Sequence, residues 1–200
     1  MKIKDDQKYD RLIQAAIALL ATGGLANFST TKVAKQAGIP QSNLYIYFKN
    51  KQALLDTVFQ TTIHTQSVAV VAELDTAAPI TIQLANSIKT LYRFSQEHPQ
   101  IVATIQVLMA DVQLKKHLHL KQDDHENQQI QTLLTDGLQA GILRSTDLNL
   151  IRYFLTRPVF NYAAGVQSGL YPDTAQGLTD LIQMIMGAIL QPDVYQEWLS

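Results

Sequence analysis

Residues 29–51 constrain the fold more than any other stretch, because they combine two short amphipathic helices with a glycine turn. Ser29 has the side-chain oxygen of a good N-cap residue. Gly38 stands where a helix needs a residue of positive φ after its last turn, and Pro40 suits the entry to a second helix. The apolar positions at helical spacing in the first helix are Val33, Ala34 and Ala37. This stretch therefore predicts helix, turn, helix, and the start of a third helix at Lys51.

The second of these helices has an apolar face and a polar face. Leu44 and Phe48 are four residues apart and are expected to face inward. The residues expected to point away from the core are Gln41, Ser42, Asn43, Ile46 and Tyr47. Asn and Gln can pair with adenine in the major groove, and Ser can bond to several bases. Nearby lysines that can neutralise phosphates are Lys32, Lys35, Lys49 and Lys51.

The run AGIPQSNLYIYFKNKQALL resembles the DNA-binding region of the tetracycline-repressor (TetR) family. The matching features are the alanine–glycine turn, Leu44–Tyr45, Tyr47–Phe48 and Lys51, and the resemblance covers about residues 10–59. It implies an all-α fold, with a helix-turn-helix DNA-binding domain at 1–50 and a ligand-binding and dimerisation domain at 51–200. One departure is Pro40, which replaces the usual Ser or Thr cap and so removes about 1 kcal/mol of capping energy.

Together, the residue chemistry and the resemblance give a set of candidate DNA contacts. The candidates for base contact are Gln41, Ser42, Asn43 and Ile46. The candidates for contact with the phosphates of the DNA backbone are Ser29, Thr30, Tyr45, Tyr47 and Lys51. No arginine lies between Ser29 and Lys51, so the commonest guanine contact is missing from this stretch. We therefore expect half-sites that are read mostly through adenine and thymine edges. The competing interpretation is plain structural packing of three short helices.

Composition excludes some classes of protein and divides the chain electrostatically. With no cysteine, disulfides, thiol nucleophiles and thiolate metal sites are excluded. Residues 1–51 carry eight Lys or Arg against three acids, a net charge of +5, whereas the remainder carries eight against fourteen, a net of −6. Such a basic end is steered toward a polyanion. The polar N-terminus is unlike a signal peptide and no stretch predicts a membrane span, so we expect a cytoplasmic protein.

Helices are expected along the rest of the chain, separated by proline and glycine. The expected spans are 7–22, 51 to about 75, 80–97, 100–113, about 127–140, 146–168 and 173–190. Residues 114–126 are polar and could be helix or loop. Thr146 or Asp147 is expected to cap the helix that contains Pro158, and Asp173 the last helix.

The two C-terminal helices are predicted to bury an apolar surface. Between Pro158 and Leu190 only Asp173 and Asp180 are charged, so this span must be covered on more than one side. We expect a homodimer through these two helices, as the resemblance implies, with an ordinary intrachain core as the alternative.

The sequence gives no support for catalysis. The densest potential metal-binding group, His117, His119, Asp123, Asp124 and His125, lies in a polar segment, and a solvated surface is the preferred interpretation. No Ser–His–acid arrangement and no glycine-rich phosphate loop is present. We therefore expect no enzymatic activity, no cofactor and no metal site. The rival interpretation, an all-α enzyme, would need convergent carboxylates or histidines on apolar helix faces, and the sequence shows none.

The body of the protein could hold a small-molecule cavity. Side chains of the right kind are Tyr92, Phe94, Gln106, Met109, Phe154, Asn161 and Tyr162. For each residue, plain core packing is the alternative, and Arg157 could meet either an anionic ligand or a salt-bridge partner. The expected function is a DNA-binding regulator on a palindromic operator, most simply a repressor released by a small molecule. The alternative is a ligand-independent regulator with a structural body. Effector, operator sequence and regulated genes do not follow from the sequence.

Overall fold

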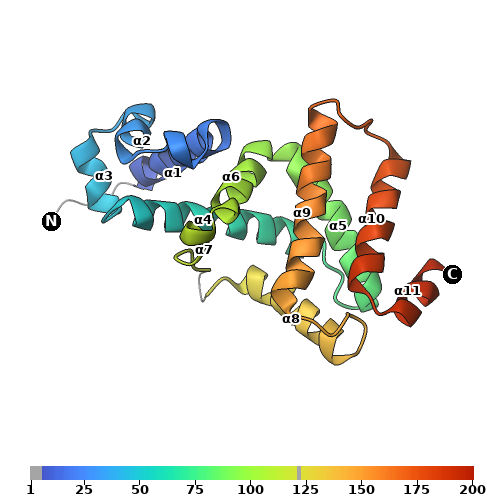
Figure 1. Ribbon diagram of the computed structural model, residues 1–200. Helices are drawn as coiled ribbons and strands as arrows, with labels where there is room; N and C mark the ends of the chain where they lie inside the picture. The colour runs from blue at the N-terminus through green and yellow to red at the C-terminus, as the bar shows by residue number, and fades with distance from the viewer. Residues whose placement is uncertain (1–5, 121–122) are drawn as a thin grey trace. The chain divides into compact units, whose positions relative to one another are not determined.

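The computed structural model describes residues 6–120 and 123–200, which form helices joined by turns and contain no strand (Figure 1). The helices are α1 (Asp6–Gly23), the 3-10 helix η1 (Leu25–Asn27), α2 (Thr30–Ala37), α3 (Gln41–Tyr47), α4 (Lys51–Val71), α5 (Ile80–Glu97), α6 (Pro99–Ala110), α7 (Val112–Lys115), α8 (His125–Gln139), α9 (Leu148–Gln167), α10 (Ala175–Ile189) and α11 (Pro192–Leu199). The predicted all-α class is confirmed. The described residues fall into two compact units, one within 1–64 and 100–123 and the other within 65–99 and 124–200.

The core of the first unit lies where α1, α2, α3 and the start of α4 meet. Its fully buried side chains include Leu12, Leu20, Val33, Leu44 and Leu54. Helix α6 also belongs to this core, because Leu108 is buried in it and the Thr104 hydroxyl donates to the Ile17 carbonyl oxygen at 3.1 Å. The predicted division at residue 50 concerns function, and it stays a prediction.

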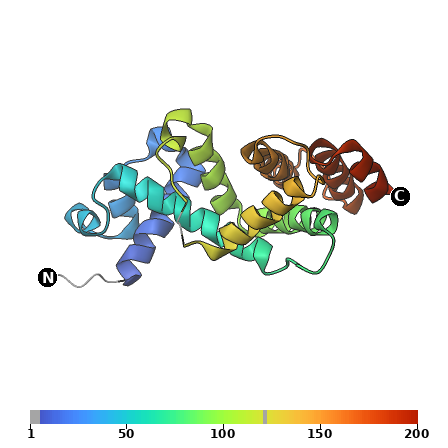
Figure 2. The same cartoon turned by 90° about the horizontal axis from the view of Figure 1, so that it is seen from below.

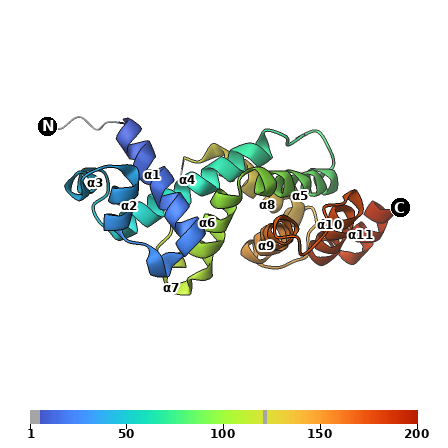
Figure 3. The ribbon, with the colours of Figure 1, turned by 90° about the horizontal axis from the view of Figure 1, so that it is seen from above.

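The second unit is built around α5, which contacts both α9 and α10. Figure 2 shows the green α5 alongside these C-terminal helices, and Figure 3 shows α10 between α9 and α11. Buried side chains from each element fill the space between them, including Ile88 of α5, Leu134 of α8, Val159 of α9 and Met186 of α10.

A group of tyrosines holds the connection between α9 and α10 against α5. The Tyr92 hydroxyl donates to Asp173 Oδ1 at 2.7 Å, and burial together with this bond raises the pKa of Tyr92 to about 12. The ring of Tyr162 lies 5.7 Å from that of Tyr92 and stacks on Tyr171 at 5.5 Å. Gly177 gives Tyr162 its space, because a Cβ there would overlap the phenol oxygen.

Two sequence predictions for the helix caps have different outcomes. Asp147 caps α9 by accepting from the Asn149 backbone N–H at 2.7 Å, as one of the two predicted candidates. Asp173 was the wrong residue for α10, whose cap is Thr174, with its hydroxyl accepting from the Gly177 N–H at 3.0 Å. Asp173 is instead used by Tyr92, a partner 81 residues away in the chain.

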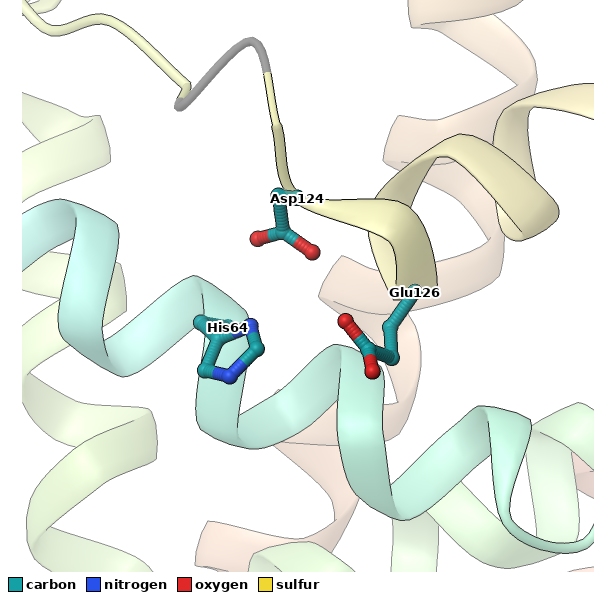
Figure 4. Close-up of side chains that lie close together, drawn as sticks. All are labelled: His64, Asp124 and Glu126. Carbon is teal, nitrogen blue, oxygen red and sulfur yellow. The ribbon is translucent and has the colours of Figure 1, made fainter.

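The polar segment and the C-terminal end contain helices that the sequence left open or did not predict. Helix α7 is a single turn that overlaps only the first two residues of the polar segment at 114–126. Helix α8 starts after Asp124, which Figure 4 shows just before the helix, and the Asp124 carboxylate accepts from the Asn127 backbone N–H at 2.9 Å. Helix α11 was not predicted, although Pro192 at its first position is a signal of a helix start. No helix among the described residues is long and apolar enough to cross a membrane. Lys2 and Lys4, two of the basic residues that give 1–51 its positive charge, lie outside the described residues.

Candidate nucleic-acid interface

The turn between α2 and α3 follows the predicted geometry. Ser29 Oγ accepts from the Lys32 backbone N–H at 3.2 Å, which confirms the cap of α2. Gly38 has φ 66°, in the left-handed region, and the Ile39 N–H then bonds back to the Ala34 carbonyl oxygen at 2.9 Å. Pro40 precedes α3 without a side-chain cap bond. The Gly38 N–H also bonds to the Lys35 carbonyl oxygen at 3.2 Å, so one glycine and two backbone bonds shape the turn between α2 and α3.

Helix α3 presents the predicted polar surface over a buried base. Leu44 is fully buried and Phe48 is 3% exposed, so both face the core as expected. The exposed side chains of the helix are Gln41, Ser42, Tyr45 and Ile46. Asn43 and Tyr47 are half-buried. The expectation that Tyr47 points away from the core is wrong, because its ring packs against the core of the first unit. A seven-residue helix is too short to persist alone, and its packing on the core is what fixes these side chains in space.

Three aromatic rings fasten the end of α3 to α1. The ring of Tyr9 stacks on Phe48 at 5.5 Å and lies 6.2 Å from Tyr47. Burial raises the pKa of Tyr9, with a smaller contribution from the Asp10 carboxylate. Sequence reasoning did not identify Tyr9, because no local pattern shows that residue 9 meets residues 47 and 48.

Two lysines are positioned by backbone carbonyls at the segment that leads into α2. Lys51 Nζ donates to the Phe28 carbonyl oxygen at 3.1 Å and lies 5.5 Å from the centre of the Phe28 ring. Lys32 Nζ donates to the Asn27 carbonyl oxygen at 2.9 Å. Both side chains are exposed, so their ammonium groups keep further donors for an anion. The role of the carbonyls at residues 27 and 28 was not predicted.

The remaining candidates for contact with the DNA backbone are Thr30, at the start of α2, and Tyr45 on α3. Thr30 Oγ1 and Tyr45 Oη are 3.3 Å apart, so these two predicted residues are brought together. Asn50, which was not predicted, caps α4 by accepting from the Ala53 N–H at 2.8 Å. A helix N-terminus with free N–H groups favours negative charge. The surface therefore combines amides, hydroxyls and ammonium groups with no carboxylate between residues 29 and 51.

The predicted pocket residues do not fall in one compact unit. Gln106 and Met109 belong to the first unit, where Met109 packs against the core. Residues of the second unit are Tyr92, Phe94, Phe154, Asn161 and Tyr162. Tyr92 and Phe94 are buried, and Phe154 is 38% exposed on α9. Their assignment to a ligand pocket stays a prediction.

Two histidines of the polar segment, His117 and His119, make ordinary contacts with side chains of α4. The His119 backbone N–H donates to Asp56 Oδ1 at 2.9 Å, and Nδ1 of the His119 ring lies 3.8 Å from the same oxygen. The His117 carbonyl oxygen accepts from the Gln52 amide at 3.4 Å. Asp124 serves as the α8 cap, and Figure 4 also labels His64 on α4.

A glycine turn joining two short helices, with an exposed amide-bearing face on the second, defines a helix-turn-helix protein. The profile of the family described as "Bacterial regulatory proteins, tetR family" matches residues 12–58. The chain belongs to this TetR family of DNA-binding transcriptional regulators.

Relatives and solved structures extend the similarity beyond the helix-turn-helix. The "Fatty acid metabolism regulator protein" of Bacillus subtilis is 25% identical over 151 residues, covering 74% of this chain and 77% of that protein. A tetracycline repressor of class A from Escherichia coli is 40% identical over 60 residues, 28% of each chain.

Among solved structures, a TetR family regulator from Marinobacter aquaeolei has a TM-score of 0.78 at 20% identity, covering 94% of this chain and 97% of that chain. A putative transcription regulator from Lactobacillus plantarum has a TM-score of 0.71 at 28% identity, with coverages of 94% and 99%. FadR from Bacillus subtilis in complex with stearoyl-CoA has a TM-score of 0.66 at 20% identity, with coverages of 89% and 97%.

Proposed function

We propose that the protein is a homodimeric repressor that binds a palindromic operator through α3. The observation that carries this proposal is the exposed polar face of α3 on the buried base of Leu44 and Phe48. Gln41, Ser42, Asn43 and Ile46 meet base edges in the major groove. Ser29, Thr30, Tyr45, Tyr47 and Lys51 meet the DNA backbone. Each copy carries one head, the helix-turn-helix domain at residues 1–50, and the two heads of the dimer bind half-sites about one helical turn, roughly 34–36 Å, apart.

The exposed apolar side chains of α9 and α10 support the dimer. Within residues 158–190, buried residues such as Phe160, Ile182 and Met186 belong to the core of the second unit, so an intrachain core explains part of this apolar span. Met184 on α10, however, is 75% exposed, and Leu150 on α9 is 47% exposed. A second copy of the chain is the partner whose matching surface would cover these side chains.

The proposed signal for release is a small molecule that binds the second unit. A fatty acyl compound is the first probe, because one relative is a fatty acid metabolism regulator and one similar solved structure contains stearoyl-CoA. A ligand moves the repressor off DNA only by binding the released conformation more tightly. A true effector therefore stabilises the folded protein and also weakens operator binding; if no compound does both, the protein regulates without a ligand.

Two alanine variants test the DNA contacts. Asn43→Ala is expected to lower the binding free energy for the preferred base by about 1–3 kcal/mol and to relax specificity at that one base-pair position. The reason is that the Asn43 amide no longer bonds to the edge of the base. Tyr47→Ala is expected to weaken binding to all sequences similarly. Fluorescence anisotropy on promoter DNA and on single-base variants of the half-site measures both effects.

Gln129→Ala is the matched control, because this exposed amide lies on α8 in the second unit. It should leave the affinity and the base preference unchanged. If Asn43→Ala and Tyr47→Ala both bind DNA like the unsubstituted protein at low salt, the assigned interface is wrong. Half-sites dominated by guanine would contradict the expected adenine and thymine readout.

A further inference from the structure

Arg152 on α9 is half-buried against α8, and its hydrogen-bond partners are carboxamide oxygens. Its Nε and Nη2 atoms donate to Gln131 Oε1 at 3.2 and 2.8 Å, and Nη1 donates to Asn127 Oδ1 at 3.2 Å. No carboxylate lies within 4.0 Å of this guanidinium anywhere in residues 6–120 and 123–200. A half-buried cation is thus held by neutral groups.

A second arginine of the same unit shows the ordinary arrangement. Arg93 is half-exposed on α5, and its Nη2 lies 2.6 Å from Glu73 Oε1. That bond raises the pKa of Arg93, whereas burial lowers the pKa of Arg152. The half-exposed Arg93 has a counter-charge, whereas the half-buried Arg152 has none among the residues that the structure describes.

The acids that precede α8 and α9 serve the backbone. Asp124 accepts from the Asn127 N–H at 2.9 Å, and Asp147 accepts from the Asn149 N–H at 2.7 Å. Both are N-caps of their helices, and neither is an ion-pair partner of Arg152. Neither of these two acids therefore neutralises Arg152.

The chemistry of the guanidinium indicates what is missing. It has five N–H donors, and the three contacts leave two for another acceptor. Desolvating a cation is costly when its partners are neutral. A planar guanidinium matches the two oxygens of a carboxylate or phosphate, and these charge-assisted bonds are strong. The NH₂ groups of the two carboxamides add donors of the kind that an oxyanion accepts.

We propose that Arg152, backed by Gln131 and Asn127, is an anion-binding position that takes the carboxylate or phosphate group of a small molecule. The binding position is independent of DNA recognition. Its use as the place where an effector is held rests on the proposed function.

Thermal unfolding of the full chain tests the position with three sodium salts at one ionic strength: phosphate, octanoate and chloride. Phosphate or octanoate at tenfold excess over its Kd is expected to raise Tm by about 3–6 °C relative to chloride. A response to phosphate alone assigns the site to phosphate groups, and a response to octanoate alone assigns it to carboxylates. Equal Tm values in all three salts would overturn the proposal.

Two variants locate the response. Arg152→Met is expected to weaken binding of the active salt about tenfold or more, since the charge-assisted bonds are lost. Gln131→Glu supplies a permanent counter-charge, so this variant should have a higher Tm in chloride and little response to phosphate or octanoate. The Gln131→Glu variant keeps the test decisive if Arg152→Met folds poorly.

Arg93→Met is the matched control, because it removes an arginine of the same unit that already has its acid. Its salt response should equal that of the unsubstituted protein. If Gln131→Glu still responds fully, the anion binds elsewhere and the proposal fails. Operator affinity measured with the same proteins separates this failure from failure of the repressor proposal, since DNA binding itself does not need Arg152.

Discussion

Leu44→Ala is expected to lower the free energy of unfolding of the first unit by about 3–5 kcal/mol, because a fully buried leucine leaves a cavity. Operator binding is expected to fall to the non-specific level. Helix α3 has seven residues and no side-chain cap at Pro40, so its position depends on Leu44 and Phe48 rather than on its own helical stability. Losing Leu44 therefore loosens the exposed face of α3 that is proposed to contact base edges.

Urea unfolding and fluorescence anisotropy on promoter DNA measure the two effects of Leu44→Ala. Ile46→Ala is the control on the same helix, where the side chain is 37% exposed. It should change stability by no more than about 0.5 kcal/mol while altering base preference. Leu134→Ala, buried in the second unit, controls for destabilisation elsewhere in the chain. Operator affinity unchanged by Leu44→Ala would show that α3 is not the reading helix.

The head could be predicted because its signals are local. Ser29 and the N–H that it caps are three residues apart, and the backbone bond across the Gly38 turn spans five. Leu44 and Phe48 show their buried face through helical spacing alone. Each of these features depends on backbone preferences that a short run of residues carries.

Partners distant in sequence could not be predicted in the same way. Lys51 meets a carbonyl 23 residues earlier, and Tyr92 meets Asp173 across 81 residues. An acid before a helix is a good local choice of cap and favours Asp173, but in the folded chain the cap of α10 is Thr174. The expected pocket residues share only a chemical type, aromatic, methionine or amide. Chemical type does not determine in which of the two compact units a side chain lies.

Arg152 illustrates the same limit for electrostatics. In the sequence, Arg157 beside Pro158 stood out as the charge in an apolar helix, and Arg152 did not. The distinguishing property of Arg152 is the neutrality of its partners on α8, which only the packed structure reveals. A missing counter-charge is a relation between elements, so residue spacing cannot show it.

Met184→Glu is expected to convert the proposed homodimer to monomers and to weaken operator binding by about 10²–10⁴-fold, since the two heads then bind independently. Met184 is 75% exposed on α10. At the end of the same face, Leu150, Phe154 and Ala188 line an open groove of about 440 Å³. A carboxylate buried without a partner in such an interface costs several kcal/mol.

Light scattering after gel filtration gives the mass, and anisotropy on full and half operators gives the affinity. Val112→Glu is the control, because this side chain is 67% exposed in the first unit and should leave both the mass and the affinity unchanged. Met184→Glu should still bind a half-site at low salt with the affinity of one head, whereas Leu44→Ala should not. A dimeric Met184→Glu protein with full operator affinity would place the subunit interface on another surface.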